Sequence, residues 1–188
     1  MTEPSLYERT TEIMKEVAAH LDTQKKPLHA DFPRGWIRSL NLLRSRWPYL
    51  PRHRARTVAC AIQLCDVNRF YLSAFKLSLT AGSMWEWHVT LPVVAVIETL
   101  SYEVVRNENW GDENVRFEKC INILHSRGIF RHPFQIELHK LRKYRNEVHL
   151  HLKEKVEMHN GRPEEYNKAV KALHNVERLL NEHFGYEK

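Results

Sequence analysis

The segment from Thr90 to about Arg106 constrains the fold more than any other part of this sequence. Its apolar residues cover nearly the whole circumference of a helix: Val93, Val94, Val96, Ile97, Leu100, Val104 and Val105. Thr90 is suited to the N-cap position, and Pro92 is tolerated in the first turn of a helix. A helix that is apolar on all sides must be surrounded by other elements, so we expect it to be the most buried element of the fold.

Helical periodicity extends over most of the remaining chain. Apolar residues recur at spacings of three and four, which predicts further helices over about 4–21, 36–46, 52–79, 112–128, 133–159 and 163–184. We expect the stretch 80–83, which contains Gly82, to break the chain between two helices, and Asp112 to cap the helix that follows it. Because no segment alternates like a strand, we expect an all-α protein. Its four- or five-helix bundle would span 51–188, and residues 1–50 would form N-terminal helices and a basic segment packing on that bundle.

Composition narrows the class of protein. Of 188 residues, 43% are hydrophobic and 28% charged, which is typical of a globular domain rather than a disordered chain. The longest apolar run, Leu91–Leu100, is shorter than the roughly 20 residues of a membrane span and contains Glu98. Residues 1–5 have no signal-peptide pattern, and the three cysteines (Cys60, Cys65 and Cys120) lack Cys-x-x-Cys spacing. We therefore expect a cytoplasmic protein with reduced thiols and no membrane contact.

The sequence offers no recognisable cofactor site. It contains no Gly-rich phosphate loop and no spacing typical of a Ser-His-Asp site. Its twelve histidines include His125, His132 and His139, which lack the cysteine or carboxylate partners of a zinc site. We expect neither a metal nor a cofactor.

Positive charge is concentrated between Asp31 and Asp66. This interval has no acidic residue and holds seven arginines, whereas the whole chain carries a net charge of +6. The seven are Arg34, Arg38, Arg44, Arg46, Arg52, Arg54 and Arg56. Guanidinium groups bind phosphates, and the interspersed Trp36, Trp47 and Tyr49 could stack on unpaired bases, which favours a surface that binds RNA. An ordinary solvated basic face with aromatic core residues is the alternative.

An arginine lies on the apolar face of the helix expected from Pro133. The apolar stripe consists of Phe134, Leu138, Leu141, Val148, Leu152 and Val156. At 100° per residue, Arg145 falls in the middle of this stripe, and Arg142 and His149 fall at its edge. A buried guanidinium requires a carboxylate or a phosphate, and Glu98 is an acid within an apolar run. We expect Arg145 to contact Glu98, either as a structural ion pair or as part of a phosphate site.

The segment Leu138–His149, which contains Arg145-Asn146, resembles the signature of the HEPN superfamily (higher eukaryotes and prokaryotes nucleotide-binding). That signature is an arginine, commonly followed by asparagine, and then a histidine after four to six intervening residues. The preceding segment 119–129 also resembles the helix and turn before the motif, and the resemblance covers about 89–184. It implies a small helical bundle that acts as a homodimer and cleaves RNA without a metal.

The same resemblance assigns roles to the motif residues. The histidine would be the general acid or base, and the arginine would stabilise the phosphorane formed when the substrate 2′-hydroxyl attacks its own phosphate. Three residues separate Arg145 from His149, five separate Arg145 from His151, and six separate Arg142 from His149. The spacing of the signature favours His151, but on the helix His149 lies about 40° from Arg145 and His151 about 120°.

The resemblance leaves three functional alternatives. The first is an endoribonuclease, and the second is a non-catalytic HEPN-like module that binds RNA, a nucleotide or a protein. The third is a structural helical protein with no such activity. Because family members often act in toxin–antitoxin or phage-defence systems, an antitoxin-like protein partner is also an expectation.

Overall fold

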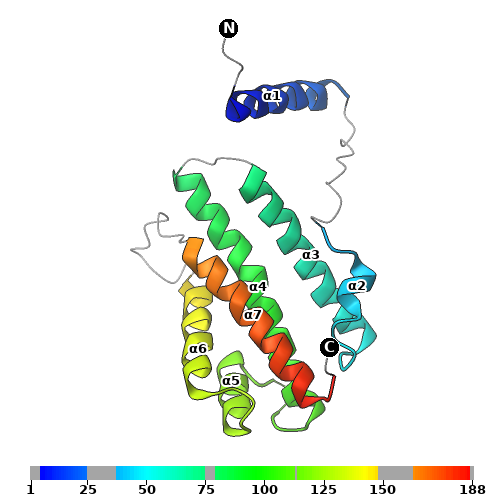
Figure 1. Ribbon diagram of the computed structural model, residues 1–188, viewed down its shortest axis with the longest axis vertical. Helices are drawn as coiled ribbons and strands as arrows, with labels where there is room; N and C mark the ends of the chain where they lie inside the picture. Colours follow the sequence, from blue (N-terminus) through cyan, green and yellow to red (C-terminus); the bar gives the residue numbers. More distant parts are fainter. Residues whose placement is uncertain (1–4, 25–36, 75–78, 113, 148–162, 187–188) are drawn as a thin grey trace.

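The computed structural model describes residues 5–24, 37–74, 79–112, 114–147 and 163–186, and every regular element in these ranges is an α-helix. The helices are α1 (Leu6–Gln24), α2 (Leu40–Arg44), α3 (Arg52–Ala74), α4 (Leu79–Asn107), α5 (Phe117–Ser126), α6 (His132–Glu147) and α7 (Pro163–His183). Helices α3 to α7 form a bundle, and α1 lies apart from it (Figure 1). The expected all-α bundle is confirmed.

Helix α4 is the centre of the bundle. It packs against α3, α5, α6 and α7, and its side chains Val94, Ile97, Leu100 and Val104 have no exposed surface. This confirms the expectation drawn from its apolar circumference. By length and composition the stretch His88–Asn107 also qualifies as a membrane span, which we did not expect, but 61% of it is buried inside the bundle. That burial is typical of a core helix.

Helix α4 begins earlier than the sequence suggested. It is continuous from Leu79 through Gly82, so the expected break at 80–83 is wrong. A glycine inside a helix costs only about 1 kcal/mol relative to alanine, and the packing of a long helix exceeds that cost. Thr90 is therefore not an N-cap, since its Oγ1 donates to the carbonyl of Glu86 at 2.7 Å inside the helix. Pro92 likewise lies within α4.

The remaining helix ends agree only in part with the predicted ones. Helix α5 begins at Phe117 after the N-cap residue Arg116, whose side chain makes no capping bond, so Asp112 does not cap it. Helix α7 begins at Pro163 as predicted. The predicted continuation of α6 to about residue 159 lies outside the described residues.

Residues 37–50 contribute to the hydrophobic core of the bundle. Helix α2 packs on α3, and Leu43, Trp47 and Leu50 are buried in the same cluster as the apolar residues of α4 and α7. By contrast, α1 exposes Ile13 and Met14 to solvent. The basic segment is thus fixed to α3 and α7, which decides the orientation of its arginine side chains.

Candidate functional site

Arg145 and Glu98 form an ion pair between α6 and α4. Arg145 Nη1 lies 2.6 Å from Glu98 Oε2, which confirms the contact expected from their positions on apolar faces. Their side chains are 32% and 29% exposed, so the pair is not fully buried as the stripe suggested. Because the guanidinium is partly open to solvent, a phosphate can approach it without displacing the core.

Arg142 forms a second ion pair one turn earlier on α6. Its Nη1 lies 3.2 Å from Glu118 Oε2 on α5, and its side chain is only 19% exposed. The Nε atom of Arg142 is buried and donates no hydrogen bond to the described residues. Helix α6 therefore presents two arginines, each held by a carboxylate of a neighbouring helix.

His139 is a further polar side chain on α6, and it belongs to a small hydrogen-bonded group. Its Nε2 lies 3.0 Å from Asn122 Oδ1 on α5, and Gln135 Nε2 donates to the same oxygen at 2.8 Å. Burial, followed by the positive charge of Arg142, lowers the pKa of His139 below its ordinary value. A neutral imidazole is therefore favoured at this position.

The other residues of the signature are placed only in part. Asn146 is exposed in the last turn of α6. His149 and His151, the two candidates for the acid or base, lie outside the described residues. The choice between them therefore stays a prediction.

The seven arginines of the basic interval do not form one solvated face. Three of them hold buried carboxylates of the bundle, in the pairs Arg38–Asp66, Arg46–Glu177 and Arg54–Glu103 at 2.7, 2.6 and 3.0 Å. The three acidic side chains are between 0% and 6% exposed. Removing such an arginine would take the shortest ion-pair contact from a buried carboxylate, so these three arginines contribute to the stability of the fold.

The remaining arginines are better placed to meet a nucleic acid. Arg44, Arg52 and Arg56 make no ion pair with the described part of the chain, and Arg52 and Arg56 are exposed. Arg44 and Arg52 line an open hollow of about 390 Å³ together with Trp47. Arg34 lies outside the described residues.

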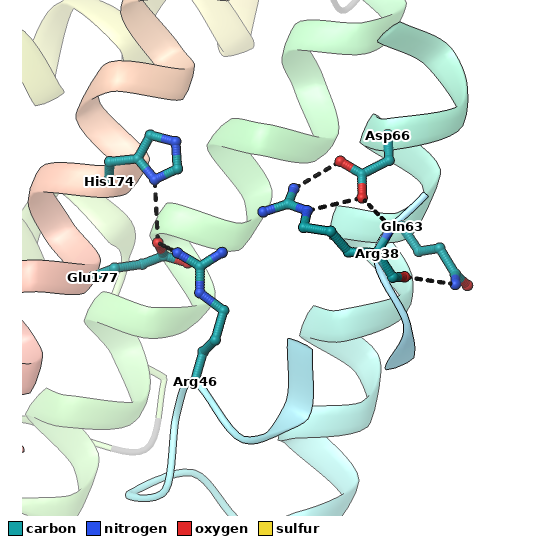
Figure 2. A network of polar contacts seen from close by, with 6 residues as sticks. All are labelled: Arg38, Arg46, Gln63, Asp66, His174 and Glu177. Atoms are coloured by element: carbon teal, nitrogen blue, oxygen red, sulfur yellow. Dashed lines mark hydrogen bonds and ion pairs between the residues drawn. The ribbon is translucent and has the colours of Figure 1, made fainter. Parts of the chain in front are cut away.

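Two of the internal ion pairs face each other across a cavity of about 210 Å³ (Figure 2). Asp66 on α3 accepts three hydrogen bonds from Arg38: from the backbone N–H at 3.1 Å, from Nε at 2.9 Å and from Nη2 at 2.7 Å. On the other side, Glu177 on α7 accepts from Arg46 and lies 3.4 Å from His174 Nδ1. The hydrogen bonds to Asp66 raise the pKa of Arg38 above its ordinary value, so the Arg38 guanidinium stays charged.

Sequence reasoning missed the carboxylates that pair with these arginines. Glu103 had a detectable signal, because it lies in the same apolar helix as Glu98 and the same argument applies to it. The sequence gives no comparable signal for Asp66 and Glu177, because they lie far along the chain from their partners Arg38 and Arg46.

Neither known relatives nor a metal site adds to this description. No family model, curated protein or solved structure matches the chain. Among the residues that the structure describes, no three histidine, cysteine or acidic side chains come together as a ligand set for a metal ion.

Proposed function

We propose that this chain is a HEPN-like, RNA-directed protein and a metal-independent endoribonuclease that acts as a homodimer. The observation that supports the proposal best is the Glu98–Arg145 ion pair at 2.6 Å. It fixes a partly exposed guanidinium at the end of α6, a few residues before His149 and His151. A fixed cation next to a titratable imidazole is what cleavage by an internal 2′-hydroxyl requires.

In this proposal Arg145 binds the scissile phosphate. A guanidinium has five N–H donors, and the contact with Glu98 involves Nη1, so other donors remain for a non-bridging phosphate oxygen. Glu98 is then a positioning residue that holds the guanidinium in place. Arg142, held by Glu118, adds positive charge one turn away on the same helix.

A second copy of the chain is part of the proposal, because the superfamily resemblance implies two motifs that face each other. Helix α6 has an exposed apolar residue, Ile136, whose side chain would be covered in a dimer that uses this helix. A protein partner that binds the same face would compete with dimer formation.

The test is cleavage of a labelled single-stranded RNA in the presence of EDTA. The expected products carry 2′,3′-cyclic phosphate ends, because the attacking hydroxyl belongs to the substrate. An RNA with 2′-deoxyribose throughout should not be cut, and Arg145→Ala should abolish cleavage. Loss of activity in EDTA, or cutting of the deoxy substrate, would contradict the mechanism.

Two further variants decide between the histidines. His149→Ala abolishes cleavage if the helical geometry governs the site, and His151→Ala abolishes it if the spacing of the signature does. RNA binding that depends on Arg145 but proceeds without cleavage would instead assign the chain to the non-catalytic binding modules.

A further inference from the structure

The cavity between the two internal ion pairs has the properties of a ligand site. It is lined from α3, α4 and α7 and by Arg38 and Arg46, which flank α2. Its volume of about 210 Å³ far exceeds the ~10–15 Å³ that admits one water molecule. Ile62, Val93 and Leu173 supply an apolar part of the wall, and charged side chains supply the rest. The space therefore suits a small polar molecule.

Hydrogen-bond donors are in excess on this wall. Arg38 uses Nε and Nη2 on Asp66, and Arg46 uses Nη2 on Glu177. The Nη1 groups of both arginines donate to no described residue, and neither is among the buried atoms without a partner. These N–H groups are therefore open to the cavity or to solvent and can bind an acceptor.

Positive charge is also in excess. Three guanidinium groups line the cavity, from Arg38, Arg46 and Arg69, but only two carboxylates do. Arg69 makes no ion pair with the described residues. His174, on the same wall, adds positive charge whenever it is protonated.

The two weakly acidic groups of the lining do not offset this charge. Burial raises the pKa of the Cys65 thiol to about 12 and also raises the pKa of the Tyr166 hydroxyl, so both groups are neutral near pH 7.

We propose that this cavity binds a small oxyanion, namely a phosphate group, either as the free ion or as a monoester. Arg69 supplies the unpaired charge, and the unused N–H groups of Arg38 and Arg46 supply directed hydrogen bonds. A cation would be repelled by the surplus guanidinium. A neutral ligand would gain less from the guanidinium groups than a charged oxyanion does.

The binding of inorganic phosphate to the whole protein tests this inference. Isothermal titration calorimetry at constant ionic strength, set with sodium chloride, should give saturable binding to one site per chain. Arg69→Gln should weaken that affinity by about tenfold or more, since it removes a charge-assisted contact. Arg69 is exposed and unpaired, so the variant should fold normally. Arg69→Lys, which keeps the charge, should retain part of the affinity.

Arg131→Gln is the matched control. Arg131 lies just before α6, is exposed, has no ion pair in the described part of the chain and does not line the cavity. Its loss removes the same charge, so phosphate affinity should change less than twofold. Equal weakening by both variants would mean nonspecific attraction to a basic protein and would overturn the site, as would the absence of saturable binding to the wild type.

A second titration with glycerol 3-phosphate identifies the source of the phosphate group. Affinity equal to or above that of inorganic phosphate would assign the site to a monoester. Binding of the inorganic ion alone would assign it to free phosphate. The wild type is the reference in both titrations, and neither depends on RNA cleavage.

Discussion

Replacing Asp66 by alanine should destabilise the protein by about 2.5 kcal/mol. The Asp66 side chain is 4% exposed and accepts three hydrogen bonds from Arg38, whose side chain is 35% exposed. Losing one partner of a buried pair costs about 3–5 kcal/mol, and Arg38 can regain water, so the low end of that range applies. Alanine favours the helix by about 0.5 kcal/mol over aspartate, which reduces the net loss.

Urea unfolding followed by helical circular dichroism measures this loss. Arg178→Ala is the control, because the exposed Arg178–Glu182 pair on α7 has a similar N–O distance of 2.6 Å but should contribute only about 0.3–0.5 kcal/mol. The double variant Arg38→Ala with Asp66→Ala should show strong coupling between the two sites. A loss below about 1 kcal/mol for Asp66→Ala would refute the argument that burial makes this pair important.

Three other outcomes follow from the structure. Glu98→Gln should cost about 1 kcal/mol of stability, since its ion pair is nearly a third exposed. The same variant should cleave RNA more slowly than the wild type even under conditions in which both are fully folded. In the native protein, Ellman's reagent should label Cys60 first, because Cys60 is exposed, whereas burial raises the pKa of Cys65 to about 12 and that of Cys120 to about 11. The pKa of His139 is lower in the folded protein than the value near 6.5 of an unfolded chain. The unfolded chain therefore takes up a proton first as the pH falls below 6.5, and the folded protein loses stability there. His139→Gln should therefore make urea stability less dependent on pH below 6.5.

Local pattern was sufficient to predict the helical class, the central helix and one ion pair. The Glu98–Arg145 contact could be foreseen because each residue is a charge on an apolar helix face, and opposite charges in such places must meet or find another partner. The same reasoning applied to Glu103 would have predicted that this carboxylate has a cationic partner, which the structure identifies as Arg54.

Other features depend on contacts between distant parts of the chain, so local pattern could not provide them. The pairing of Arg46 with Glu177 joins residues 131 positions apart, and no local pattern links the two. The helix boundary at Gly82 was mispredicted because the packing of α4 outweighs the local preference of glycine. The phosphate cavity arises only where α3, α4 and α7 converge.

The position of α7 in the chain has a consequence for how the protein is made. Helix α7 covers α4 and also carries Glu177, the partner of Arg46 in the segment after α2. During synthesis, α4 emerges from the ribosome long before α7, so the part of its apolar surface that α7 covers stays exposed until α7 is complete. We expect nascent chains that end before Pro163 to bind chaperones or aggregate, and Arg46 to reach its partner only as a late step of folding.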